Sequence, residues 1–237
     1  MDDLRDAIPR ALVSESSASS KLRTRGVTPV QQARSKATFA ALVTAGLKIA
    51  ERNDFFASTV EDVVKAAKVS VGAFYERFES KETFFSVLQE IVARRIEIAV
   101  RKRVSIPGFA VLDFDLAVGA IVESWMTGVR LHRGLIRASL RHIPVRDDAW
   151  FPLRRLGAHM GDIFVEVLRE RVAISSRRGL ESRVRIALQF VHGVVVNIIL
   201  NNPGPIGLDD RELDERIRQV LSLLVRDENG RKTRAPR

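Results

Sequence analysis

The chain has 237 residues, of which 46% are hydrophobic and 29% charged, the balance of a soluble globular protein. It contains no cysteine, which excludes disulfide scaffolds, thiol nucleophiles and thiolate metal sites. Its four histidines are dispersed, so we expect no metal and no cofactor. The longest apolar run, residues 186–200, is interrupted by polar residues and predicts a buried helix rather than a membrane span. The first residues lack the pattern of a secretory signal, and we therefore expect a cytoplasmic protein.

Positive charge is concentrated in the first half of the chain and at its end. The formal net charge is +10. Residues 21–103 carry 16 Lys and Arg against nine Asp and Glu, whereas residues 104–230 are close to neutral. Residues 231–237 add four basic residues. This distribution favours a polyanion-binding module followed by a module of another kind, although a basic soluble surface would have the same charge.

The first predicted elements are a tail and a long helix. Residues 1–27 end in a Ser-rich, basic stretch that is typical of a disordered tail. Thr28 and Pro29 have the pattern of an N-cap and a first helical residue. Apolar residues then recur at intervals of three and four up to Arg52, which predicts a helix with one buried face. Asn53 can end it, since Asn tolerates the left-handed conformation.

Two short helices are predicted next. Thr59 and Asp62 have the spacing of a capping box, which opens a helix extending to residue 67. Ser70 can cap another helix that extends to Phe78. Only residues 68–70 separate the two helices, and this spacing is typical of a helix-turn-helix.

The rest of the chain also predicts helices. Ser80 can cap a long helix over residues 81–102, and a Pro-Gly pair then interrupts the pattern. Five further helices are predicted, at residues 113–131, 135–142, 148–174, 181–201 and 210–225. No alternating strand pattern occurs, so the predicted fold is all-α with about nine helices. The expected divisions are a tail (1–27), a helix-turn-helix domain (28–79), a second domain (80–226) and a basic tail (227–237).

Several short motifs follow one another between Phe39 and Leu88. They are Ala50-Glu51-Arg52, Ser58-Thr59-Val60-Glu61-Asp62-Val63, Ala66-Ala67-Lys68-Val69-Ser70, Gly72-Ala73-Phe74-Tyr75, Phe78 and Ser80-Lys81-Glu82. In order and spacing they resemble the DNA-binding domain of TetR-family transcriptional regulators. The resemblance implies an N-terminal three-helix DNA-binding domain followed by a helical ligand-binding and dimerisation domain.

Four residues depart from the pattern that many relatives share. Asn53 stands where Gly is common, a harmless change because Asn tolerates the left-handed conformation. Lys68 stands where Gly is common, so it either adopts a left-handed conformation or shifts the turn. Ala73 stands where Thr is common, which removes a hydroxyl. Arg77 stands where His is common and keeps a cationic group for phosphate.

The second short helix is the predicted recognition helix. Small residues at its N-terminal end allow close approach to base edges in a major groove, and hydroxyl and cationic groups around it suit phosphate oxygens. The N-terminus of the preceding helix is a further phosphate site. The expected DNA-contacting residues are Thr59, Ser70, Val71, Gly72, Ala73, Tyr75, Arg77 and Lys81.

Each of these assignments has an alternative. The alternative for Tyr75 is a half-buried aromatic residue of the core. The alternative for Lys81 is a solvated residue beside the helix cap. Lys21, Arg23 and Arg25 form an arm that could enter a minor groove or only a tail.

The second domain is expected to dimerise and to bind a small molecule. Residues 181–201 are apolar nearly all round and residues 210–225 carry an apolar stripe, so these two helices suit the dimer interface that the resemblance implies; one intramolecular bundle is the alternative. The resemblance also implies a ligand pocket. Its candidate lining residues are Trp125, Met126, Val129, His159, Met160, Phe164 and Phe190, with His132 or Asn197 as a polar anchor. Most are apolar, which favours an apolar ligand.

Together these features predict a ligand-responsive repressor that binds a palindromic operator in double-stranded DNA as a homodimer and is released by a small, apolar molecule. The alternatives are a helical small-molecule or lipid-binding protein with a non-functional helix-turn-helix, and an enzyme. No phosphate-binding glycine loop or nucleophile elbow is present in the sequence. The paired aspartates at residues 113 and 115 and at 209 and 210 lie at predicted helix starts, where the helix dipole explains them. An enzyme is therefore disfavoured.

Overall fold

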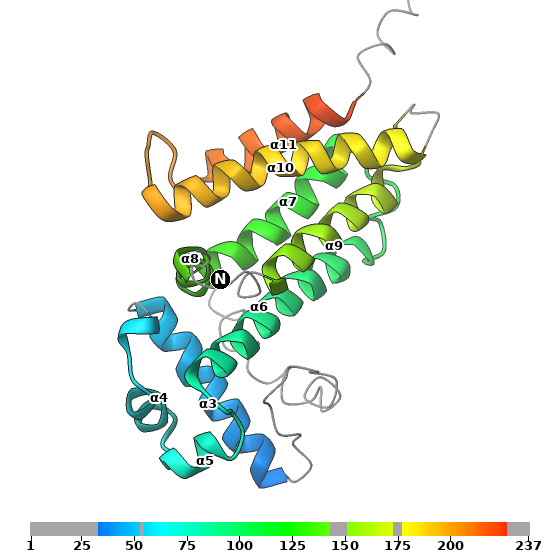
Figure 1. The fold of residues 1–237 in the computed structure, drawn as a ribbon. Coiled ribbons are helices and arrows are strands. Elements are labelled where there is room, and N and C mark those ends of the chain that lie inside the picture. The colour runs from blue at the N-terminus through cyan, green and yellow to red at the C-terminus, as the bar shows by residue number, and fades with distance from the viewer. Residues whose placement is uncertain (1–32, 53–54, 143–150, 173–176, 227–237) are drawn as a thin grey trace, which may run out of the picture. The chain divides into compact units, whose positions relative to one another are not determined.

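The computed structural model describes residues 33–52, 55–142, 151–172 and 177–226. Within these ranges the chain forms nine α-helices, one short 3-10 helix and no β-sheet (Figure 1). The predicted all-α fold with about nine helices is confirmed. The predicted tails, the cap at Thr28 and Pro29 and the helix end at Asn53 lie outside the described residues.

The elements follow one another in the order that the sequence predicts. They are α3 (Ala33–Arg52), η1 (Phe55–Ala57), α4 (Val60–Ala67), α5 (Val71–Tyr75), α6 (Lys81–Val104), α7 (Phe114–Leu131), α8 (Arg133–His142), α9 (Phe151–Leu168), α10 (Arg177–Asn201) and α11 (Arg211–Val225).

Some predicted boundaries are wrong because the glycines used as breaks lie inside helices. Gly179 and Gly134 occupy the first turns of α10 and α8, so both helices begin earlier than predicted. A first-turn residue has no intrahelical acceptor for its N–H, so little helical hydrogen bonding depends on glycine there. The predicted C-terminal end of α9 is also wrong. The helix stops at Leu168, where the Arg171 side chain and backbone donate to carbonyl oxygens of the last turn.

The chain divides into two compact units, and the division falls within α6 between Ile91 and Val92. The N-terminal unit contains α3, η1, α4, α5 and the start of α6. The C-terminal unit contains the rest of α6 and the helices α7 to α11. Helix α6 therefore belongs to both.

The N-terminal unit has an aromatic core. Phe55, Phe74, Phe78 and Phe84 are completely buried. The Phe84 ring lies 4.7 Å from that of Phe78 and 5.3 Å from that of Phe74, centroid to centroid. Helix α3 approaches this cluster closely at Gly46, where an added Cβ would lie 2.7 Å from Phe84 Cζ. These tight contacts fix α3 and α5 against α6.

The C-terminal unit is built around α10. This helix packs against α8, α9 and α11, and α11 packs against α7; α10 and α11 lie side by side in Figure 1. By length and composition alone α10 could cross a membrane. Its contacts pack one face of it into a helical bundle, but only 39% of its apolar stretch is buried, so the predicted buried helix is correct for one face only.

Two polar clusters hold α11 onto α7. Near one end, Arg130 donates to both carboxylate oxygens of Asp214, at 2.9 and 2.5 Å. Near the other end, Asp115 accepts from Ser222 at 2.8 Å and from Arg226 at 2.5 Å. Because the paired groups are only partly exposed and the Arg130 contact is bidentate, these clusters fix the register of the two helices.

His132, between α7 and α8, makes the stability of the fold depend on pH. It is 6% exposed. Burial, with the nearby Arg95 guanidinium, lowers its pKa from 6.5 to about 4. The unfolded chain therefore takes up a proton below pH 6.5 that the folded chain refuses until about pH 4. We expect the free energy of unfolding to fall by about 3 kcal/mol across this window.

Urea unfolding at several pH values measures this effect. Burial also lowers the pKa of His192, so this residue too makes the free energy of unfolding fall as the pH falls. The His132→Gln variant should lose the larger part of the pH dependence, whereas His142→Gln, with a less buried side chain, should keep it. A variant at His132 that keeps the wild-type slope would contradict this prediction.

Candidate nucleic-acid interface and effector cavity

The start of α4 is closed by the predicted capping box. The Thr59 N–H donates to Asp62 Oδ2 at 2.8 Å, and the Asp62 N–H donates to Thr59 Oγ1 at 3.2 Å. The Thr59 hydroxyl donates to the same carboxylate at 3.1 Å. These hydrogen bonds, the backbone one first, lower the pKa of Asp62. The capping box is confirmed. Its Thr59 hydroxyl proton is donated to Asp62 within the protein.

The turn between α4 and α5 contains a left-handed residue. Lys68 has φ 57° and ψ 43°, and its N–H donates to Lys65 O at 3.2 Å. Of the two alternatives for this position, the left-handed conformation is therefore the correct one. Ser70 then caps α5 as predicted, its Oγ accepting from the Ala73 N–H at 3.1 Å.

The strain at Lys68 predicts a stabilising substitution. A left-handed residue with a Cβ costs about 1–2 kcal/mol, and glycine avoids this cost but loses roughly 0.5–1 kcal/mol more chain entropy on folding. We expect Lys68→Gly to raise the free energy of unfolding by about 0.5–1 kcal/mol. Urea unfolding checks this, with the helical Lys65→Gly as the matched control that should lose about 1 kcal/mol.

Helix α5 buries the Phe74 side chain and leaves the others exposed or half-buried. Phe74 is completely buried, whereas Val71 is 38% and Tyr75 55% exposed. Gly72 is also exposed, and Ala73 is half-buried. Among the described residues, no side chain covers the N-terminal face of α5, while Phe74 anchors the helix to the aromatic core.

Arg77 and Lys81 are less available than the sequence suggests. Arg77 is 8% exposed, and its Nε has no hydrogen-bond partner among the described residues. Lys81 Nζ donates to the carbonyl oxygens of Phe56, at 3.1 Å, and Ser58. It also lies 5.2 Å from the ring centroid of Phe55. Lys81 therefore ties the start of α6 to the segment before Thr59, a long-range contact that sequence spacing does not reveal.

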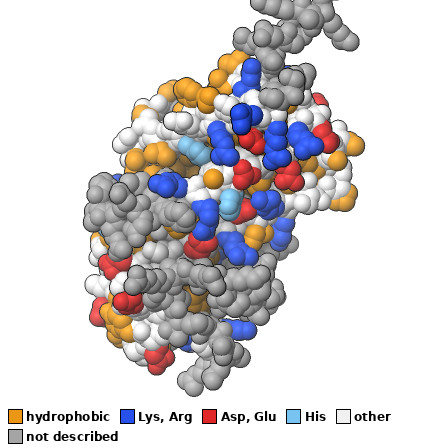
Figure 2. All heavy atoms as spheres, turned by 45° about the vertical axis from the view of Figure 1, so that its right-hand side comes forward, with side chains coloured by type: hydrophobic (Ala, Val, Ile, Leu, Met, Phe, Trp, Pro, Cys, Tyr) orange, Lys and Arg blue, Asp and Glu red, His pale blue; other side chains and the backbone are white. Residues whose placement is uncertain are grey.

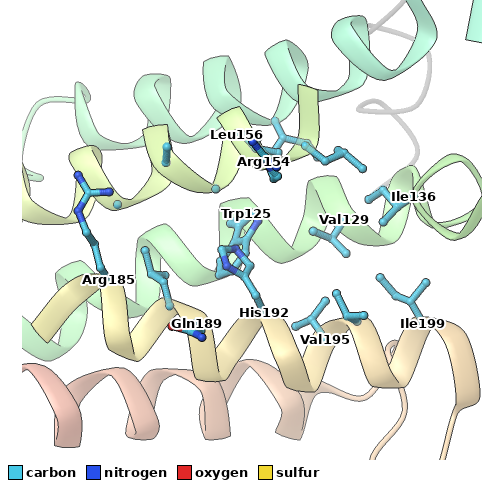
Figure 3. Close-up of a pocket in the computed structure, with 17 residues that line it drawn as sticks. Trp125, Val129, Ile136, Arg154, Leu156, Arg185, Gln189, His192, Val195 and Ile199 are labelled. Carbon is cyan, nitrogen blue, oxygen red and sulfur yellow. The ribbon is translucent and has the colours of Figure 1, made fainter. Parts of the chain in front are cut away.

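A cavity of about 460 Å³ lies within the C-terminal unit (Figure 3). Helices α9 and α10 form most of its wall, and α6, α7 and α8 contribute the remainder. Its lining residues are Ile96, Trp125, Val129, Ile136, Leu153, Arg154, Leu156, Gly157, Ala158, Gly161, Arg185, Leu188, Gln189, His192, Val195, Val196 and Ile199.

Two of the candidate ligand-binding residues line this cavity and five do not. Trp125 and Val129 contribute to its wall. Three others are fully buried side chains that fill the core beside it, namely Met126, Met160 and Phe164. His159 instead contacts Glu97 through Nδ1 at 2.9 Å, and Phe190 is 62% exposed on the outer face of α10.

The two candidate polar anchors also lie elsewhere. His132 is buried, and Asn197 lies at a separate surface hollow beside Phe190. The polar lining residues are instead Arg154, Arg185, Gln189 and His192. The last three follow one face of α10 at intervals of four and three, so a search for polar residues on one helical face could have found them.

An apolar stripe runs along the outside of α10 and α11. Its members are large hydrophobic side chains with 38–66% of their surface exposed, namely Ile186, Phe190 and Val194 on α10 and Val220 and Leu223 on α11. The first three recur every four residues and so share one helical face. They lie on the two helices that the sequence assigns to dimerisation.

Comparison with known proteins agrees with these elements. Residues 42–88 match the family model of bacterial regulatory proteins of the tetR family. No curated protein matches the chain. Three similar solved structures are a TetR transcriptional regulator from Rhodococcus sp. RHA1, Salmonella enterica GusR, and Thermus thermophilus FadR, a TetR-family repressor in complex with lauroyl-CoA.

The similarity extends over most of the chain at low identity. The Rhodococcus structure is 16% identical, covers 81% of this chain and 97% of its own, and has a TM-score of 0.55. GusR is 15% identical, with coverages of 79% and 95% and a TM-score of 0.58. FadR is 18% identical, with coverages of 83% and 98% and a TM-score of 0.55. The matched family and these neighbours are regulators, not enzymes. The chain therefore carries the DNA-binding domain of the TetR family of bacterial regulatory proteins within the all-α fold of TetR-family transcriptional regulators.

Proposed function

We propose that the protein is a ligand-responsive transcriptional repressor that binds a palindromic operator in double-stranded DNA as a homodimer and is released by a small, apolar molecule. The observation that carries the proposal is the uncovered N-terminal face of α5, held by Phe74 on a rigid aromatic core. A helix presented in this way can enter a major groove without rearrangement.

The proposed DNA contacts follow from the exposure of each residue. Val71, Gly72 and Ala73 meet base edges, because they are small and lie at the leading end of α5. The neighbouring polar residues position the unit on the phosphates; they are Thr59, Ser70, Tyr75, Arg77 and Lys81. Within this group Tyr75 makes a direct contact, whereas Lys81 acts by holding the segment before α4.

The apolar stripe supports a homodimer. An exposed apolar surface at one face of a two-helix layer suits an isologous contact with a second copy, which brings two recognition helices to one DNA site. A two-fold pair reads half-sites about 10 base pairs apart or a multiple of that.

The cavity supports the effector role. Its volume of about 460 Å³ suits a small organic molecule, and its wall is mostly apolar. One neighbour of the same fold was solved with an acyl-CoA bound. Since α6 belongs to both units, it is the element through which ligand binding would change operator affinity, by about 5- to 150-fold for a coupling of 1–3 kcal/mol.

Selection of binding sites from random duplex DNA tests the proposal. We expect the wild type to recover a two-fold symmetric motif and Tyr75→Ala to bind it about tenfold more weakly, with the exposed Leu116→Ala on α7 as the unaffected control. Lys81→Met should weaken DNA binding without changing its salt dependence. Loss of a direct phosphate contact would instead lower the slope of log affinity against log salt concentration by about one. Recovery of no motif, together with ligand binding, would favour a helical ligand-binding protein instead.

A further inference from the structure

We infer that the molecule bound in the cavity is an elongated amphipathic anion, with its acidic group in the part of the cavity lined by Arg154, Arg185, Gln189 and His192 and its apolar body toward Ile136 and Ile199. This inference rests on the proposed effector role of the cavity and replaces a wholly apolar ligand by one that also carries an acidic group. The volume and the apolar wall alone would suit a neutral molecule equally well.

The cavity is elongated, and its two ends differ. Its residues on α10 extend from Arg185 to Ile199, a rise of about 21 Å at 1.5 Å per residue. Figure 3 shows Arg185 at one end and Ile136 and Ile199 at the other, with Arg154, Trp125 and His192 between them. A long molecule with one polar and one apolar end therefore matches the wall along its whole length.

Among the described residues, the charged groups in the wall are cationic. Two arginines line the cavity, and no Asp or Glu of the described ranges does. Arg154 is exposed and makes no ion pair within the described part of the chain. Arg185 has a 3.4 Å contact with Asp162, but the two side chains are 56% and 62% exposed, so this pair is weak. On the face of the molecule in Figure 2, Lys and Arg side chains are interspersed with Asp and Glu. Each guanidinium group can therefore turn to a carboxylate in its own part of the cavity, Arg185 at the end and Arg154 in the middle.

His192 and Trp125 supply polar atoms in the middle of the cavity. Their rings meet edge to face, 5.1 Å apart at 85°. Gly157 makes room for the imidazole, since an added Cβ there would lie 3.3 Å from His192 Cε1. No described residue hydrogen-bonds to the imidazole nitrogens or the indole N–H, and none of these atoms is fully buried. They are therefore open to a polar group of the ligand.

Isothermal titration calorimetry on the full chain tests the inference with probes that share one alkyl chain. The probes are dodecanoate, dodecanol, dodecylamine and the dodecanoyl-CoA thioester. We expect dodecanoate to bind roughly 10- to 100-fold more tightly than the alcohol or the amine, the increment of a charge-assisted hydrogen bond. The comparison of dodecanoate with its CoA thioester tells whether a free carboxylate or a phosphate-bearing carrier supplies the negative charge.

Variants locate the acidic group. The Arg154→Gln and Arg185→Gln variants, singly and together, should weaken binding of the anion toward that of dodecanol and leave dodecanol unchanged. Arg169→Gln, an exposed position that does not line the cavity, is the matched control. Binding of none of the probes, equal binding of anion and alcohol by the wild type, or equal losses for both in the variants would overturn the inference.

A second readout separates this inference from the proposed function. Operator affinity is measured with and without saturating dodecanoate. If the anion binds as expected but operator affinity does not change, the ligand class is correct and the effector role is wrong. If neither arginine matters and yet an apolar probe releases the operator, the effector role holds and the anionic ligand is wrong.

Discussion

Replacing Phe84 by Ala is expected to destabilise the N-terminal unit by about 3–5 kcal/mol. The ring is completely buried, lies within 4.7–6.2 Å of the Phe78, Phe74 and Phe55 rings, and fills the space left by Gly46. Its removal leaves a cavity where three elements meet. Since domains are stable by only about 5–15 kcal/mol, operator binding should be lost with the fold of this unit.

Urea unfolding followed by far-UV circular dichroism measures the loss. Val111→Ala is the control, because Val111 is 85% exposed and its truncation should change the free energy of unfolding by less than about 0.5 kcal/mol. A loss below about 1 kcal/mol for Phe84→Ala would show that the aromatic cluster does not hold α3, α5 and α6 together.

Placing a charge in the apolar stripe is expected to separate the proposed homodimer. Phe190 is 62% exposed between Ile186 and Val194 on the same face of α10. In a two-fold dimer each substitution enters the interface twice. At about 2 kcal/mol for each copy, Phe190→Glu should raise the dimer dissociation constant by roughly 1,000-fold. Sedimentation over a range of protein concentrations measures this change, and affinity for a palindromic operator should fall with it.

A charge on another exposed apolar residue is the control. Leu116 on α7 is 59% exposed and lies outside the stripe, so Leu116→Glu should leave the dimer intact. Both variants should keep the wild-type circular dichroism spectrum, because neither side chain is part of the core. A Phe190→Glu protein that sediments as the wild type does would remove the stripe from the proposed interface.

The elements that the sequence predicts well depend on neighbouring residues. The Thr59–Asp62 capping box and the Ser70 cap join groups three residues apart, so their hydrogen bonds follow from spacing alone. The order and number of the helices follow from apolar periodicity in the same way. Gly179 shows the limit of such signals, because a glycine in a first turn does not end a helix.

The sequence by itself thus determined the helical order, the helix-turn-helix and the caps of its two short helices, since these arise within a few residues. The tertiary structure decided which distant groups meet. Lys81 reaches the carbonyl of Phe56, 25 residues away, and His192 lies against Gly157 on another helix. Periodicity tells which helix face is buried, but not whether a buried side chain fills the core, as Met160 does, or faces a cavity, as Trp125 does. That choice depends on how the helices pack, because a cavity is space left between elements rather than a property of any one of them.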